Sequence, residues 1–276
     1  MDYDCYLIDS YNMAYRQWWA LKDMKYNGIH TGLEFGFIKK IVSYINAYKD
    51  KVYLAWDGAP IRCETLSENY KSTREDNKVN SNEPSWSPRL ERVRLAFNNI
   101  CKSLYHPEEE ADEQIAKFVL KNKDKSILIV SNDKDMQQFI SSRVNVLSGD
   151  SLINGEVCLN KWGIPSYKIP LYKSLDGDVS DNIPKVPRLL TATKLKLVNM
   201  SSNIDELIEN FNSNELKEKE REKLNLYKEQ VVNSYKMANL LNLEGDYNIT
   251  LPNGDKSLLN QILIDLGLNS ISLSGI

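Results

Sequence analysis

Acidic side chains recur along this sequence at positions from which several of them can reach one site. Some follow a short apolar, β-prone run and precede a turn. Others form pairs spaced three residues apart, which puts both carboxylates on one face of a helical turn. The acids in question are Asp9, Asp57, Glu110, Asp112, Glu113, Asp133, Asp135, Asp178 and Asp181. Their recurrence at three strand ends and in two pairs predicts that they converge.

Carboxylates that converge need a compensating charge. Two of them about 4 Å apart repel by about 4 kcal/mol at an effective dielectric constant near 20, so the cluster favours bound cations. Ligands that are all oxygen favour Mg²⁺ or Mn²⁺. Two such ions held about 3.5 to 4 Å apart activate a water and stabilise both oxygens of a phosphodiester hydrolysis. A single acid after a strand more often caps the next helix, so the hypothesis rests on the whole set.

A basic segment, Tyr70-Lys71-Ser72-Thr73-Arg74, supplies a second candidate function. Lys71 and Arg74 would share a helix face and could bind one phosphate, the lysine as a point charge and the arginine through two hydrogen bonds. Such residues are also common on polar surfaces. Beside an acidic cleft, Lys71 would act as an electrophile at the phosphate that is cut.

The elements expected to position the acids are strands that alternate with helices. Apolar runs end at Asp9, Asp57 and Asp133, and helical periodicity marks residues 33–48, 88–104 and 111–121. This alternation predicts βαβ units and a parallel sheet. Ligands of open parallel sheets bind at the carboxyl ends of the strands, where these three acids fall.

Two changes of composition indicate the domain organisation. Residues 61–87 are polar and lack an apolar period, and after residue 172 two prolines precede a Lys/Leu/Glu-rich stretch that runs to Leu241. We predict an α/β core in residues 1–172, with an arch or loop at about 61–104, and a helical region in residues 173–276. The last part, residues 242–276, is expected to pack as a final helical cap.

Composition and charge exclude few partners. The N-terminal segment carries Asp2, Asp4 and Asp9 and predicts no signal peptide. The apolar runs are far shorter than the roughly 20 residues of a membrane helix, so a cytoplasmic protein without a membrane partner is expected.

The net charge of -3 is unusual for a nucleic-acid binder, but nine acids at a metal site leave -3 + 9 = +6 elsewhere. The four cysteines are far apart and predict reduced thiols without zinc.

Six motifs, in this order, resemble the flap endonuclease family, which includes phage 5′-3′ exonucleases and the 5′-nuclease domain of bacterial DNA polymerase I. They are LIDS (7–10), AWDG (55–58), YKSTR (70–74), EADE (110–113), SNDKDMQQ (131–138) and GDVSDNIPKVP (177–187). The resemblance spans about residues 4–197. It implies a PIN-like parallel-sheet nuclease core, a helical arch or loop that admits single-stranded 5′ DNA, and a helix-three-turn-helix region in the C-terminal part that grips duplex.

The resemblance also implies roles for single residues. All nine acids match the family's metal-site acids, with Asp133 among the catalytic residues, and two Mg²⁺ or Mn²⁺ ions are the implied cofactors. Tyr70, Lys71 and Arg74 match the arch-base motif, in which the lysine and the arginine contact the scissile phosphate. The first ion would lie nearer Asp9, Asp57, Glu110, Asp112 and Asp133, and the second nearer Asp135, Asp178 and Asp181.

The chain departs from the family pattern after Pro184. The family has glycines there, whose amides approach a DNA phosphate and often hold a monovalent cation such as K⁺. Lys185, Arg188 and Leu190 stand in this segment instead, which puts the K⁺ site in question. Lys185 and Arg188 would then bind the substrate through their side chains. A milder departure is Glu113, where the family usually has aspartate.

We therefore predict a metal-dependent 5′-nuclease that acts on 5′-flap, nicked or gapped DNA in replication and primer removal. An RNA–DNA hybrid is a further candidate substrate, and a monomer that works with a replication polymerase is expected. The Asn- and Lys-rich composition fits a stand-alone phage or bacterial enzyme, in the host cytoplasm if phage-encoded. Two alternatives are a PIN-type ribonuclease, which lacks the element at 177–187, and a catalytically weak branched-DNA-binding protein. The balance of exonuclease and flap endonuclease activity stays open.

Overall fold

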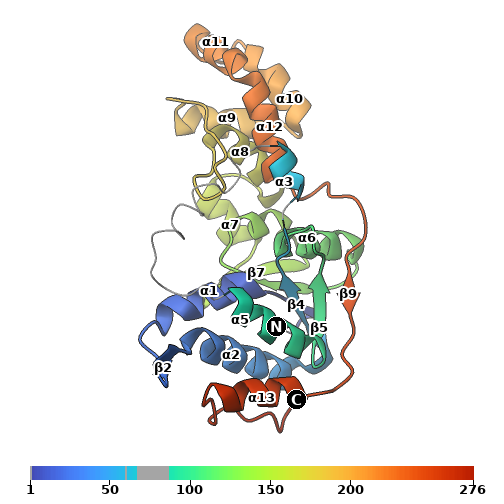
Figure 1. The fold of residues 1–276 in the computed structure, drawn as a ribbon. Coiled ribbons are helices and arrows are strands. Elements are labelled where there is room, and N and C mark those ends of the chain that lie inside the picture. Colours follow the sequence, from blue (N-terminus) through green and yellow to red (C-terminus); the bar gives the residue numbers. More distant parts are fainter. Residues whose placement is uncertain (1, 60, 67–86) are drawn as a thin grey trace.

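A mostly parallel seven-stranded sheet forms the centre of the molecule, as the computed structural model shows (Figure 1). The structure describes residues 2–59, 61–66 and 87–276. The strand order is β8-β7-β6-β1-β4-β5-β9, and only the two edge strands, β8 and β9, run antiparallel to their neighbours. The strands are β1 (Cys5–Asp9), β4 (Val52–Trp56), β5 (Lys102–Tyr105), β6 (Ile127–Val130), β7 (Val144–Ser148), β8 (Ser151–Ile153) and β9 (Ile249–Thr250). This confirms the predicted α/β class.

The central strands are apolar because both faces of the sheet are covered. Every residue of β1, β4 and β6 is buried, as expected for parallel strands between two helical layers. Strand β1 lies between β4 and β6, with Asp9 opposite Ala55 and Ile8 opposite Val130. The three strands therefore end at the same edge, and their terminal acids follow there.

Alternate residues of β1 enter different cores. Tyr6 and Ile8 pack with α1 (Ser10–Ala20), α2 (Gly32–Tyr48), α5 (Ser87–Asn98) and α13 (Ser257–Asp265). Cys5 and Leu7 pack on the opposite face with α6 (Ala111–Lys121), η2 (Asp135–Phe139) and α7 (Gly155–Trp162). This follows from the two-residue period of a strand. The helices predicted at 33–48 and 111–121 are confirmed, whereas the helix predicted at 88–104 ends at Asn98 and is followed by β5.

A helical region stands over the carboxyl edge of the sheet (Figure 1). It has its own apolar core, to which α8, α9, α11 and α12 contribute Leu175, Leu197, Leu224 and Val231. Its elements are α8 (Ile169–Asp176), α9 (Thr191–Met200), α10 (Ile204–Glu209), η4 (Asn210–Asn212), α11 (Glu218–Leu226) and α12 (Lys228–Ala238). Helix α12 descends towards the sheet and packs beside α3 (Ile61–Leu66). The short elements η1 (Lys49–Lys51), η3 (Ser166–Lys168), β2 (Lys25–Tyr26) and β3 (Ile29–His30) complete the list.

The chain is divided differently from the expected boundaries in two places. Strand β9 pairs with β5, and Leu259 and Ile262 of α13 enter the same core as α2, so residues 249–265 return to the α/β core. Within the expected arch at 61–104, α5 buries Leu90 and Phe97 in that core as well. Apolar residues at helical spacing explain the burial of α5 and α13, whereas β9 is held by its pairing with β5. Among the described residues, no helix has the length and apolar character needed to cross a membrane.

Candidate active site

Asp9 ends the central strand and caps the helix that follows. One of its carboxylate oxygens accepts a hydrogen bond from the Asn12 amide (3.1 Å), and the other accepts one from the Ser131 hydroxyl (2.7 Å). Both donors are neutral. Burial, reinforced by the charges of Asp57 and Asp133, raises the pKa of Asp9 to about 7. A cation bound here would stabilise the ionised form.

The turn after β6 is tied to β1 through Ser131. The Ser131 hydroxyl donates to Asp9 and accepts from the Asp133 amide (3.0 Å). The Asp133 carboxylate accepts in turn from the Asp135 amide (2.8 Å), so the turn holds the two acids close together. The charge of Asp133 acts on both of its neighbours in the row, because it raises the pKa of Asp9 and the pKa of Asp135.

The first turn of α6 brings a second set of acids to the same edge. Asp57, just after β4, accepts a hydrogen bond from the Ala111 amide (2.8 Å). Glu110 caps the helix, and the Glu113 carboxylate reaches back to the Glu110 amide (3.1 Å), as in a capping box. Asp112 belongs to this same turn, so the turn that carries Glu110 and Asp112 is held against Asp57 through the Ala111 amide. The other oxygen of Glu113 forms an ion pair (2.5 Å) with Arg62 of α3.

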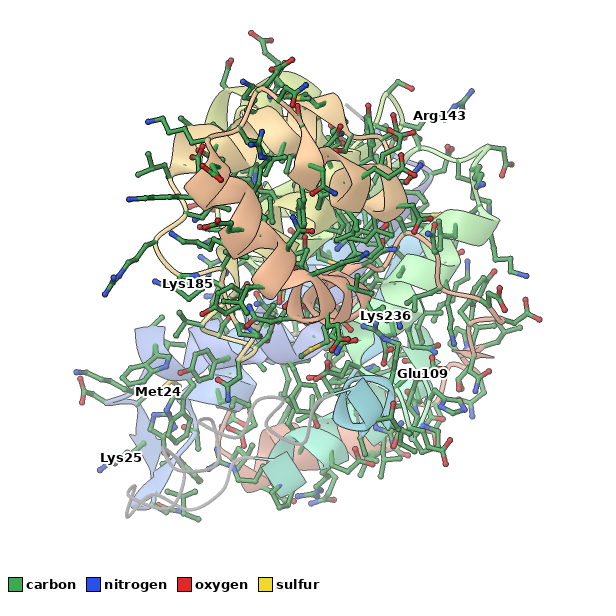
Figure 2. All side chains as sticks on the ribbon, turned by 90° about the horizontal axis from the view of Figure 1, so that it is seen from above. Met24, Lys25, Glu109, Arg143, Lys185 and Lys236 are labelled. Atoms are coloured by element: carbon green, nitrogen blue, oxygen red, sulfur yellow. The ribbon has the colours of Figure 1, made fainter. Side chains whose placement is uncertain are left out.

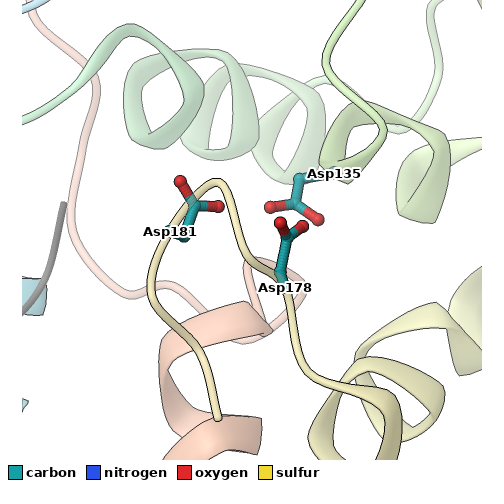
Figure 3. Close-up of side chains that lie close together, drawn as sticks. All are labelled: Asp135, Asp178 and Asp181. Carbon is teal, nitrogen blue, oxygen red and sulfur yellow. The ribbon is translucent and has the colours of Figure 1, made fainter. Parts of the chain in front are cut away.

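Asp135 meets two further acids, from the loop after α8 (Figure 3). Carboxylate oxygens of Asp135, Asp178 and Asp181 lie within 4.8 Å of one another. The loop after α8 folds back on itself through two backbone hydrogen bonds between Asp178 and Ile183 (2.8 and 2.9 Å). Gly177 has φ 74°, and a Cβ there would meet the Ile183 carbonyl oxygen at 2.6 Å, so this turn requires glycine.

A buried lysine lies within this second group. Lys173 of α8 is 4% exposed, and its ammonium contacts Asp135 and also Asp178 at 2.6 Å. Burial raises the pKa of Asp135 to about 7 although Lys173 opposes the shift. Burial also acts to raise the pKa of Asp178, but Lys173 and the hydrogen bonds from Ser180 together outweigh it, and the net shift is downward. For Lys173, burial lowers the pKa and the two carboxylates raise it more, so it is charged at neutral pH.

The acids thus form one row along the edge of the sheet. It runs from the first turn of α6 through Asp57, Asp9 and Asp133 to Asp135, and ends at the 178–181 loop. The donors are carboxylate oxygens, two of them on buried groups whose pKa values are about 7. This donor set fits hard divalent cations. Six of the predicted acids are linked in this row by their charges or contacts, namely Asp9, Asp57, Asp133, Asp135, Asp178 and Asp181. Glu110, Asp112 and Glu113 belong to the α6 turn at its end, whereas Tyr70, Lys71 and Arg74 lie outside the described residues.

Lys185 and Arg188 project from the loop between α8 and α9. Val186 and Leu189 are buried on its inner side, while Lys185 and Arg188 are exposed. Arg188 has φ 53°, a left-handed conformation that suits the glycine usual in the family. Figure 2 shows Lys185 at one margin of the helical region. The loop therefore presents two cations outward.

Two residues of the site were missed by the analysis of the sequence, Lys173 and Arg62. Lys173 lies in a mixed helical stretch five residues before Asp178, and nothing in its spacing separates it from a surface lysine. Arg62 stands in a polar segment, and its partner Glu113 is 51 residues away. Only a three-dimensional arrangement brings either residue to the acids.

Fold and site together define a class of protein, the α/β nucleases with a row of carboxylates at the strand ends. Residues 4–163 match the family described as 5′-3′ exonuclease, N-terminal resolvase-like domain. The match covers more than half of the sequence, and this chain belongs to that family.

Several known proteins are similar to the chain over most of its length. A 5′-3′ exonuclease of Aquifex aeolicus is 26% identical, covering 96% of this chain and 93% of the relative. DNA polymerase I of Caldicellulosiruptor bescii is 28% identical over 96% of the chain, which spans only 32% of that polymerase. Among solved structures, a bacteriophage T5 flap endonuclease with DNA and metal ions has a TM-score of 0.69 at 15% identity, covering 86% of this chain and 89% of that one. The T5 5′-exonuclease with bound zinc has a TM-score of 0.70 at 14% identity, covering 96% and 98%.

Proposed function

We propose that this chain is a metal-dependent 5′-nuclease that hydrolyses phosphodiester bonds of 5′-ended or flap DNA. The observation that supports it most is the continuous row of carboxylates, from the α6 turn to the 178–181 loop, at the carboxyl edge of the sheet. The relatives named as 5′-3′ exonucleases and the T5 enzyme bound to DNA and metal ions support the same reaction.

Two groups of residues are suited to hold divalent ions, and we propose Mg²⁺ or Mn²⁺. Asp9, Asp57, Glu110, Asp112 and Asp133 would hold the first, and Asp135, Asp178 and Asp181 the second. When bound, two such ions supply a hydroxide nucleophile and charge stabilisation at the phosphate. The chain fixes its carboxylates through neutral donors, such as Ser131 on Asp9 and the Ala111 amide on Asp57. Lys71 and Arg74 are proposed to contact the scissile phosphate, with Tyr70 beside them.

The proposal is tested by incubating a 5′-labelled flap duplex with the protein and Mg²⁺, with wild type beside Asp133→Asn. We expect labelled products from wild type and on the order of 10²- to 10³-fold slower cleavage by the variant, because a ligand of the metal ion is lost. Replacing Mg²⁺ by EDTA should stop wild-type cleavage. Binding of the flap without cleavage in either protein would instead favour the branched-DNA-binding alternative.

The substrate range is part of the proposal. Nicked, gapped and flap duplexes are the proposed DNA forms, and replication with primer removal is the proposed setting. The same cleavage assay with an RNA strand in the labelled position distinguishes a hybrid-cutting enzyme from a strict DNA nuclease. Sedimentation of the free protein tests the proposed monomer, and co-purification with a replication polymerase tests that partner.

Lys185 and Arg188 are proposed to bind duplex phosphates. Because each phosphate contact releases counterions, replacing both by alanine should weaken duplex binding and reduce the slope of log K against log salt by about 2. Binding is measured in Ca²⁺ over a range of salt concentrations. Lys219→Ala in α11, an exposed lysine elsewhere in the same region, serves as the single-charge comparison. Unchanged duplex affinity in the double variant would remove these residues from the interface.

A further inference from the structure

Arg62 joins three elements that are far apart in the sequence. Its guanidinium forms an ion pair with Glu113 of α6 (2.5 Å) and donates to the backbone carbonyls of Lys236 (3.0 Å) and Met237 (3.4 Å) in α12. Arg62 itself belongs to α3, which follows β4 and Asp57. One side chain therefore links three helices: α3, α6, whose first turn carries Glu110 and Asp112, and the last turn of α12.

We propose that Arg62 and Glu113 are positioning residues of the nuclease reaction, which set the geometry of the acids on α6 and tie it to α12. This inference rests on the proposed function, because it assigns these two residues a role at the same metal site. Neither side chain is proposed to touch the substrate. They act through Glu110, Asp112 and the helix ends that they join.

The electrostatics of the two helix ends favour this arrangement. The carbonyls of Lys236 and Met237 belong to the final turn of α12, where groups lack partners within the helix and a cation is stabilised. Glu113 lies in the first turn of α6, where the exposed amides stabilise an anion. The ion pair spans the gap between a helix end that favours a cation and one that favours an anion.

Both oxygens of Glu113 are engaged by protein groups. One pairs with Arg62, and the other accepts from the Glu110 amide at 3.1 Å. The second contact fixes the residue that begins the first turn, and the Ala111 amide is fixed by Asp57. The side chain of Glu113 is 4% exposed, so it has little room for another arrangement. Rotation of this first turn would move Glu110 and Asp112 together.

The length of Glu113 matters for this role. An aspartate in this position would be one methylene shorter. The glutamate reaches the Glu110 amide and the Arg62 guanidinium at once. Shortening it to aspartate is therefore expected to break one of the two contacts.

A matched ion pair elsewhere in the molecule provides the control. Arg89 of α5 pairs with Glu34 of α2 and donates to the His30 carbonyl, so it too joins a carboxylate and a backbone carbonyl. The exposed fractions match as well: 24% and 1% for Arg89 and Glu34, against 25% and 4% for Arg62 and Glu113. Arg89 packs in the α2 layer and takes no part in the row of acids.

The experiment measures Mn²⁺ binding to the free protein by titration calorimetry for wild type, Arg62→Met and Arg89→Met, with the thermal midpoint of each. We expect Arg62→Met to weaken Mn²⁺ binding by about 10- to 100-fold, the usual effect of losing a group that orients metal ligands. Arg89→Met should lower the thermal midpoint and leave Mn²⁺ affinity within about twofold. The Mg²⁺ concentration for half-maximal flap cleavage should rise for Arg62→Met in parallel with the loss of affinity.

Conservative variants keep the test decisive if Arg62→Met does not fold. Arg62→Lys retains the charge beside Glu113 but cannot span both carbonyls, and Glu113→Gln retains the acceptor for the Glu110 amide but not the charge. Both variants should bind Mn²⁺ more weakly than wild type. If Arg62→Met folds, their affinities should lie between those of wild type and Arg62→Met. Mn²⁺ affinity equal to wild type in these variants overturns the inference. Absence of cleavage by wild type overturns the proposed function instead, and the calorimetric result still decides the role of Arg62.

Discussion

Asp9→Asn is expected to reduce flap cleavage by at least about 10³-fold while making the metal-free protein more stable at pH 8. Cleavage falls because a ligand at the centre of the acidic row becomes neutral. Stability rises because a buried charge beside Asp57 is removed. Asparagine keeps an oxygen that can accept from the Asn12 amide, so the cap of α1 survives.

The pH dependence follows from the raised pKa of Asp9, about 7 against 3.8 for the ordinary carboxyl. Between these values the native state holds a proton that the unfolded state has lost, so wild-type stability falls as the pH rises from about 4 to about 7. Asp9→Asn lacks this dependence. The gain in its free energy of unfolding should be near zero at pH 4 and on the order of a few kcal/mol at pH 8.

Urea unfolding in EDTA at pH 4, 6 and 8 measures this difference, and flap cleavage in Mg²⁺ gives the activity. Excess Mg²⁺ should reduce the stability gain at pH 8, because the ion stabilises wild type more than the variant. A variant that is less stable than wild type at pH 8 without metal would contradict the account of Asp9 as a strained, uncompensated carboxylate.

Lys173→Met is expected to destabilise the metal-free protein by about 3 to 5 kcal/mol, because Asp135 and Asp178 lose the cation buried between them. A divalent ion can take over part of that charge compensation. Ca²⁺ should therefore raise the free energy of unfolding more in the variant than in wild type. Urea titrations in EDTA and in Ca²⁺ at pH 8 measure both effects.

Lys194→Met is the matched control for this prediction. Lys194 is 6% exposed, similar to Lys173, but its partner Asp176 is half-exposed and lies outside the acidic group. Water can solvate Asp176 when the lysine is lost, so a smaller destabilisation without Ca²⁺ dependence is expected. Equal behaviour of the two variants would mean that Lys173 has no special relation to the metal-binding acids.

Much of the candidate site could be predicted because strand ends are local features. A run such as Leu7-Ile8-Asp9 predicts a buried strand that ends in an acid. A parallel sheet then brings such acids to one edge. The i, i+3 spacing of Asp178 and Asp181 predicted that they share one face of a helical turn; their carboxylates do lie close together, but in a loop closed by the Asp178–Ile183 bridge. The third member, Asp135, completes the group within 4.8 Å.

Contacts between distant segments could not be predicted in the same way. The Arg62 guanidinium donates to backbone carbonyls that lie 174 and 175 residues further along the chain. The periodicity of a sequence cannot predict such a contact. The return of β9 and α13 to the core was missed for a related reason. Strand β9 has two residues, and its stability comes from pairing with β5 rather than from its own pattern.

The return of the chain to the sheet sets a condition on the order of folding. Leu104 pairs with Ile249, and α13 packs in the same core as α2, so this core is completed by segments that follow the helical region in the chain. Pairings between distant segments form slowly, because a long loop must close before they contribute. On the ribosome, the part of this core that α13 covers therefore stays exposed until the helical region has emerged, and this exposed apolar surface favours aggregation of the nascent nuclease.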